Sequence, residues 1–145
     1  MGRCALLRTF VLPIIDYMYV AAGDLLISNI LEGPIAEQTE LVALRNEEKP
    51  MDAFEKFYHD DIEKADIDGV TMTGKAVNHQ RGLDLLSKIT AVRELSNKGF
   101  IVAGDRSFTT WQIDFDHVDW AAVKGTEIAI QDWKDGRIVR ERIVL

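Results

Sequence analysis

Cysteine is nearly absent from this chain of 145 residues, with Cys4 the only one. A single cysteine excludes an intramolecular disulfide and a thiolate metal cluster, and it is typical of a reducing compartment, so we expect a cytoplasmic protein. The three histidines, His59, His79 and His117, lack the spacing of a metal site. The sequence therefore predicts neither a metal nor a cofactor.

Clusters of basic residues are also scarce. The chain carries 17 Lys and Arg against 24 Asp and Glu, a net charge of −7 at pH 7. The only basic series is the short one formed by Arg137, Arg140 and Arg142. Proteins that bind nucleic acid normally present a basic face to the phosphates, so this composition argues against a nucleic-acid partner.

Long uninterrupted apolar runs are missing too, even from the apolar residues 1–34. Arg8, Asp16 and Asp24 divide this stretch into runs shorter than the ~20 residues that span a bilayer. The short run Phe10–Ile15 contains Pro13 and does not lead to a small-residue cleavage site, so it does not fit a signal peptide. We interpret residues 1–34 as an appended segment that packs on the domain or on a partner, or as an extension from a misplaced start codon. We expect no membrane association.

Residues 35–145 have the patterns of one α+β domain. Apolar residues at helical spacing predict helices over 35–49, over 52–58 with core aromatics Phe54, Phe57 and Tyr58, and over 75–89. The third helix would bury a stripe formed by Val77, Leu83, Leu86 and Ile89. Alternating residues predict a strand over 62–69 and hairpins at Gly104-Asp105 and Asp135-Gly136. Helices precede strands, so an antiparallel sheet is expected.

The Asp135-Gly136 turn predicts the register of the last hairpin. A two-residue turn pairs Trp133 with Ile138, and an unbroken register then pairs Ile130 with Glu141. The face expected to cover the core would carry Ile128, Ile130, Asp132, Val139, Glu141, Ile143 and Leu145. The opposite face would carry Glu127, Ala129, Gln131, Trp133, Ile138, Arg140, Arg142 and Val144 and be exposed or face a subunit.

Glu141 is the anomalous residue on the predicted core face. An unpaired carboxylate among aliphatic side chains is costly to bury, so Glu141 must line a wet cavity, pair with a base or bind a proton. In a cavity its pKa would rise toward the range of a general acid or base. The alternative is a structural pair with a buried Arg, Lys or Tyr.

Three stretches carry a family resemblance: LVALRNEEKPMDAFEKFYHDDIEKADIDG, GKAVNHQRGLDLL and the closing GTEIAIQDWKDGRIVRERIVL. In order and local pattern, residues 36–145 resemble SnoaL-like proteins of the nuclear transport factor 2-like superfamily, relatives of polyketide cyclases and ketosteroid isomerases. The resemblance implies a cystatin-like cone, in which a curved antiparallel sheet wraps around roughly three helices. It also implies a pocket at the open end and a homodimer.

The same resemblance implies which residues would act. Ketosteroid isomerases place a base in a D-x-x-G context, which Asp66 matches, but their two oxyanion donors correspond here to Leu41 and Ile128, which cannot donate. Steroid isomerisation by that mechanism is therefore not expected. We take Asp66 and Glu141 as the candidate catalytic residues. The candidate pocket residues are Tyr58, His79, Trp111, Ile128, Ile130 and Asp132.

Two functional hypotheses follow. The first is a cofactor-independent cyclase or isomerase in which a carboxylate moves a proton on a small hydrophobic carbonyl compound. The second is a non-catalytic ligand-binding or dimeric accessory module with the same fold. In the first, Asp66 and Glu141 face one cavity; in the second, Glu141 sits in a closed pair and Glu141→Gln chiefly lowers stability.

Overall fold

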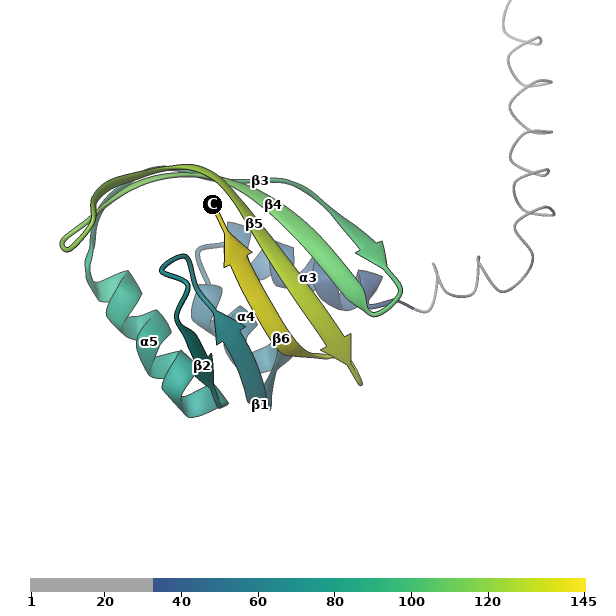
Figure 1. Cartoon of the computed structure of the whole chain (residues 1–145). Coiled ribbons are helices and arrows are strands. Elements are labelled where there is room, and N and C mark those ends of the chain that lie inside the picture. The colour runs from purple at the N-terminus through teal and green to yellow at the C-terminus, as the bar shows by residue number, and fades with distance from the viewer. Residues whose placement is uncertain (1–32) are drawn as a thin grey trace, which may run out of the picture.

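The computed structural model describes residues 33–145, which form three helices and six strands (Figure 1). The expectation for residues 1–34 falls almost wholly outside this range. The helices are α3 (Ile35–Asn46), α4 (Pro50–Phe57) and α5 (Lys75–Ser87). The strands are β1 (Tyr58–Ala65), β2 (Thr71–Thr73), β3 (Ile89–Ala103), β4 (Arg106–His117), β5 (Ala121–Lys134) and β6 (Arg137–Val144).

The strands form one curved sheet in the order β2-β1-β6-β5-β4-β3. The α+β cone expected from the sequence is confirmed, with α3 and α4 behind the sheet in Figure 1. The expectation of a wholly antiparallel sheet is wrong in one place, because β1 pairs with β6 in parallel. β1 and β6 are the first and last strands of the chain, and the other elements lie between them in sequence. A long connection of this kind allows parallel pairing, whereas a short hairpin allows only antiparallel pairing.

Several local features differ from the sequence prediction: the strand expected over 62–69 is β1 (Tyr58–Ala65), and Thr71–Thr73 form a strand, β2, that was not predicted. Tyr58 was expected at the end of a helix, but α4 ends at Phe57 and Tyr58 opens β1. The side chains of Phe57 and Tyr58 are nevertheless both buried in the core, because a helix-to-strand junction can bury adjacent residues. The predicted apolar stripe of α5 is wrong, since Val77, Leu83 and Leu86 are each at least 40% exposed. Only Asn78 of this helix is buried.

The main core lies between α3, α4 and the concave face of the sheet. Its buried members are Leu41, Val42, Ala53, Phe54, Phe57, Tyr58, Ile62, Trp111, Ile113, Trp133 and Ile138. Within residues 33–145, no helix is both long enough and apolar enough to cross a membrane.

The last hairpin confirms the predicted turn and corrects the predicted register. Asp135 and Gly136 both have positive φ, and Trp133 pairs with Ile138. A bulge at Val139 then shifts the pairing, so Glu141 lies opposite Gln131 and not opposite Ile130. A bulge adds one residue to one strand, here β6. Beyond the bulge, each β6 side chain therefore shares a face with the β5 side chains that an unbroken register would place on the opposite face. The predicted core face of β5 is wrong for this reason.

On β5, the side chains on the concave face are consequently Glu127, Ala129, Gln131 and Trp133. Ile128, Ile130 and Asp132 lie on the convex face. On β6, the residues Ile138, Glu141 and Ile143 are buried. The predicted burial of Glu141 is confirmed, at 2% exposure, although its neighbours differ from those expected.

A substitution at the turn tests this geometry. Gly136 has φ of 72°, a region in which a Cβ costs about 1–2 kcal/mol. An added Cβ would touch nothing closer than Glu37 Oε1 at 3.6 Å, so Gly136→Ala should destabilise through the backbone alone. We expect urea denaturation to show this loss, with Asp135→Asn close to neutral because Asn tolerates positive φ. An unchanged urea midpoint for Gly136→Ala would contradict the turn.

Candidate functional site

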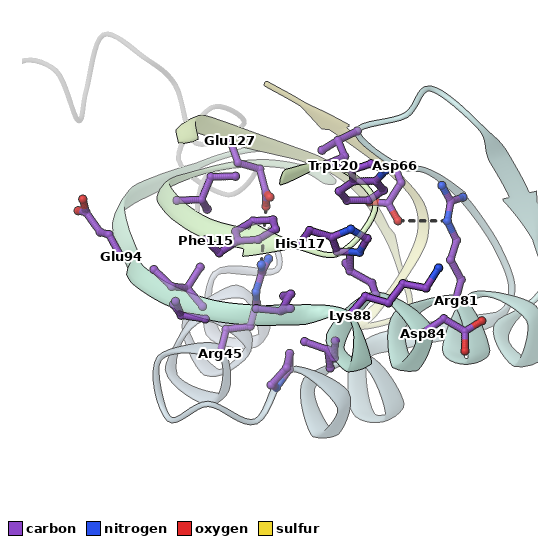
Figure 2. A pocket seen from close by; sticks show the side chains of 18 of the residues that line it. Arg45, Asp66, Arg81, Asp84, Lys88, Glu94, Phe115, His117, Trp120 and Glu127 are labelled. Atoms are coloured by element: carbon purple, nitrogen blue, oxygen red, sulfur yellow. Dashed lines mark ion pairs between the residues drawn. The ribbon is translucent and has the colours of Figure 1, made fainter. Parts of the chain in front are cut away.

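A cavity of about 620 Å³ opens between the concave face of β3–β5, the C-terminal half of α5 and the loop after β1 (Figure 2). Its volume falls in the range of small-molecule sites. Apolar side chains form much of the wall: Leu85, Leu86, Ile89, Val92, Leu95, Ile113, Phe115 and Trp120. Leu86 and Ile89 of the predicted apolar stripe thus face the cavity instead of a packed core.

Glu127 reaches this cavity from β5. Its side chain is 14% exposed, and it lies opposite Trp111 of β4, with Phe115 further along the same wall. Burial raises the pKa of the Glu127 carboxyl, with Arg45 opposing the shift and the negative charge of Glu141 adding to it. A desolvated carboxyl group of this kind holds a proton more readily than one in water.

Arg45 is the cation nearest to Glu127. Its Nη2 atom lies 3.7 Å from Glu127 Oε1, close enough for an ion pair but too long for a hydrogen bond. The guanidinium also stacks 4.4 Å from the ring centroid of Trp111, which is fully buried. The aromatic ring therefore fixes the cation from one side and leaves its N–H groups free to meet a ligand.

Glu141 lies behind the cavity wall, in a polar network within the core. Its carboxylate accepts hydrogen bonds from Lys64 Nζ at 2.6 Å, from Gln131 Nε2 at 2.6 Å and from the Tyr58 hydroxyl. Burial alone would raise the pKa of Glu141, but the charge of Lys64 and these hydrogen bonds hold it below its ordinary value. Glu141 is therefore an ionised, fully occupied acceptor.

Two of the donors to Glu141, Tyr58 and Lys64, are themselves titratable, and the pKa of each is raised. Burial, followed by the negative charge of Glu141, raises the pKa of the Tyr58 hydroxyl well above its ordinary value, so Tyr58 keeps its proton. Burial opposes the charge of Lys64, but Glu141 and Asp66 outweigh it and leave the pKa of Lys64 raised. Lys64 is thus a cation and Glu141 an anion, so the two form a true ion pair.

Lys64 connects this buried network to the cavity. Its ammonium lies 2.6 Å from Glu141 and 3.4 Å from Asp66, and Asp66 lines the cavity. Asp66 is also 3.6 Å from Arg81, which makes two hydrogen bonds to Asp68 (Figure 2). A chain of alternating charges therefore runs from the core to the cavity wall.

His117 and Trp120 form another part of the wall. Their rings stack with centroids 4.0 Å apart. His117 Nδ1 accepts the backbone N–H of Asp119 at 3.1 Å, so the neutral ring carries its proton on Nε2. No group of three or more His, Cys, Asp or Glu within the described part of the chain could hold a metal ion.

Comparison with known proteins identifies the fold. No family model matches the sequence, and no curated protein sequence matches it. Among solved structures, a protein named as a SnoaL-like polyketide cyclase from Mesorhizobium loti superposes with a TM-score of 0.68 at 22% identity, covering 74% of this chain and 95% of its own. Residues 33–145 have the SnoaL-like fold.

Two other structures support the same assignment. A cystatin-fold protein from Novosphingobium aromaticivorans has a TM-score of 0.63 at 13% identity, covering 78% of this chain and 98% of its own. A protein named as a polyketide cyclase from Xanthomonas campestris has a TM-score of 0.60 at 17% identity, covering 81% and 93%. At these identities the SnoaL-like fold is shared, and the chemistry has to be argued from the site.

The SnoaL-like fold brings some of the predicted site residues to the cavity and not others. Asp66 lines it, whereas Glu141, Tyr58 and Trp111 lie behind its wall. His79 lies on α5, 3.4 Å from Glu55 and outside the cavity lining. The bulge at Val139 places three further predicted pocket residues on the convex face: Ile128, Ile130 and Asp132.

Sequence reasoning missed Glu127 and Arg45. The unbroken register placed Glu127 on the exposed face of the last hairpin, and nothing in the sequence around Arg45 distinguished it from other helix-surface arginines. One signal was present: Trp133 opposite Ile138 is the apolar pair next to the turn, and following the alternation back from Trp133 places Glu127 inside.

A Glu141→Gln substitution tests the buried network. Removing the charge leaves the Lys64 ammonium without its closest partner, and breaking a buried pair in this way costs about 3–5 kcal/mol. Because the pKa of Glu141 is lowered in the folded state, its contribution is present above the ordinary carboxyl range and is lost as pH falls through the folded value. Denaturant unfolding should therefore show a large deficit at neutral pH that shrinks in acid.

Glu63→Gln is the matched control for this measurement. Glu63 is the neighbour of Lys64 on β1, 49% exposed, and lies 3.7 Å from Arg140. An exposed pair of this kind contributes at most about 1 kcal/mol. Equal losses in the two variants would show that the Glu141 network does not stabilise the fold as described.

Proposed function

We propose that the cavity binds a small apolar carbonyl compound and that Glu127 moves a proton on the carbon beside the carbonyl, without a cofactor. The observation that carries this proposal is the position of Glu127: a carboxyl group with a raised pKa in the wall of a largely apolar cavity. A base whose pKa lies nearer to neutrality is effective in proton transfer.

Glu127 suits this role better than the two carboxylates expected from the sequence. Glu141 accepts three hydrogen bonds and its pKa is lowered, so it is a weak base, and it does not line the cavity. Asp66 lines the cavity, but its charge lies between Lys64 and Arg81. In this proposal Asp66 binds and orients a polar group of the substrate.

Glu127 takes the proton, the C–H electron pair forms a carbon–carbon double bond, and the carbonyl π electrons move to oxygen. The resulting enolate is stabilised by an N–H of Arg45, which the ring of Trp111 holds in place. In a β,γ-unsaturated substrate the enolate is a dienolate, and return of the proton from Glu127 to its γ-carbon gives the conjugated isomer. In a substrate with a second carbonyl, attack of the enolate carbon on that carbonyl closes a ring, and the proton held by Glu127 passes to the new alkoxide.

Two of the structures with this fold are named as polyketide cyclases, and a ring closure through an enolate is chemistry of that kind. The alternative is a module that binds a ligand without turnover. The closed Glu141–Lys64 pair favours it, because that pair was the feature expected of a non-catalytic protein. The two proposals differ in what Glu127 does.

Exchange of the α-protons of 2-tetralone in D2O, followed by proton NMR, tests the role of Glu127. We expect the wild-type protein to accelerate exchange, with a rate that rises as Glu127 ionises, and Glu127→Gln to lower it by about 10²–10⁴-fold. The variant should be no less stable at neutral pH, since a raised carboxyl pKa destabilises the folded state once the group ionises.

Glu94→Gln is the control, because Glu94 lies at the edge of the same cavity and pairs with Lys98. It should retain the wild-type rate. A loss in Asp66→Asn that equals or exceeds the loss in Glu127→Gln would move the base to Asp66. Binding of 2-tetralone without accelerated exchange would support the non-catalytic module.

Substitution of Arg45 separates charge stabilisation from binding. Arg45→Met should lower the exchange rate by about 10²–10³-fold, the usual effect of removing one donor to a developing oxyanion. Arg45 also lowers the pKa of Glu127, so its loss should move the midpoint of the pH–rate profile to higher pH. Arg45→Lys should restore part of the rate. An unchanged midpoint in Arg45→Met would show that Arg45 does not act on Glu127.

A further inference from the structure

The convex face of the sheet carries an apolar patch made of Ile101, Phe108, Ile128, Ile130 and Val144. Ile101 is 69% exposed, and Phe108, Ile128 and Val144 are between 36% and 41% exposed. Register places these residues together, because Ile101, Phe108 and Ile130 pair across β3, β4 and β5, and Ile128 pairs with Val144. Within residues 33–145, no helix covers this patch (Figure 1).

The described part of the chain begins at the edge strand that carries Ile101 of this patch. Gly33 lies against the β3–β4 turn so closely that an added Cβ would meet Val102 Cγ1 at 2.7 Å and Gly104 O at 2.8 Å. Val102 follows Ile101 on β3, which is an edge strand, and by strand alternation its side chain lies on the face opposite Ile101. Gly33 therefore lies at the edge strand that carries Ile101, so a segment attached there reaches the patch by passing around that edge.

The sequence of residues 1–32 has the composition that such a patch would bind. Roughly two thirds of these residues are hydrophobic, against 47% in the whole chain. The segment also carries Asp16 and Asp24. Arg142 pairs with Ile130 in the same row of the sheet and makes no ion pair to any residue of the described range.

We propose that residues 1–32 dock on the convex patch of their own chain. Length does not limit the contact, since the four strands β3 to β6 span roughly 15 Å and 32 residues can reach about 100 Å. A tether of this kind sets an effective concentration in the roughly millimolar range, so the attached segment outcompetes a second copy of the protein at micromolar concentration. This inference does not depend on the proposed function.

A nitroxide tag on the full-length protein tests the docking. Cys4 is the only cysteine and takes the tag directly; Cys4→Ser with Ala21→Cys moves it to the middle of the segment. Methyl-labelled isoleucines provide matched probes, with Ile101, Ile128 and Ile130 on the convex face and Ile62, Ile113 and Ile138 on the core face. We expect the convex-face methyl signals to lose more intensity than the core-face signals, relative to the reduced tag.

A mixed sample distinguishes the chain's own segment from a second copy. Tagged, unlabelled protein is added to untagged, methyl-labelled protein, and docking within one chain predicts no loss of signal. A loss that persists in the mixture would assign the patch to a dimer and overturn the proposal. Equal effects on both faces, or none from either tag, would also overturn it.

A surface substitution provides an independent check. Ile128→Lys places a charge in the centre of the patch and should abolish the intensity loss at Ile101 and Ile130. Thr126→Lys, two residues earlier on the same strand and exposed, is the control and should preserve it. Retained broadening in Ile128→Lys would show that the segment contacts another surface.

Discussion

The desolvated charge of Glu141 is the constraint on which the arrangement of this SnoaL-like fold depends. A buried carboxylate is tolerated only when hydrogen-bond donors surround it. Glu141 accepts hydrogen bonds from three side chains: Tyr58 and Lys64 of β1 and Gln131 of β5. These donors belong to strands that neighbour β6 on either side. The network therefore fixes the register of β1, β6 and β5 together, including the parallel pair of β1 and β6.

The same network separates the roles of the carboxylates. Glu141 accepts three hydrogen bonds and its pKa is lowered. Glu127, on the neighbouring strand, has a raised pKa, and among residues 33–145 its ion-pair partner is Arg45 at 3.7 Å. Two carboxylates in one electrostatic cluster thus have opposite character, and the negative charge of Glu141 contributes to the shift at Glu127. The negative charge of Glu141, behind the cavity wall, therefore makes Glu127 in the wall easier to protonate.

The sequence was sufficient for the α+β class, for the order of the elements other than β2 and for the burial of Glu141, because these follow from periodicity and from a turn that only certain residues can form. It was insufficient for the faces of β5. The bulge at Val139 decides these faces, and no local sequence pattern at Val139 predicts it. The pairing of Glu141 with Lys64 was likewise beyond reach, since it joins residues 77 positions apart through the parallel contact. The predicted buried stripe of α5 was wrong, because helical spacing of apolar residues does not say whether a packed core covers them: Val77 and Leu83 are exposed, and Leu86 lines the cavity.

This distribution of polar and apolar groups has a consequence for the convex face. The concave face accommodates Ser107, Thr109, Gln131 and Glu141 at fully or nearly fully buried positions, so polar side chains occupy sites that aliphatic residues would fill in a simpler core. Ile128 and Ile130, on the alternate positions of the same strand, are displaced outward by the same register. Because alternate residues of a strand point to opposite faces, the register that turns Gln131 inward turns Ile128 and Ile130 outward, and an exposed apolar surface of this kind favours association. A covering segment attached at Gly33 would remove that exposure within a single chain.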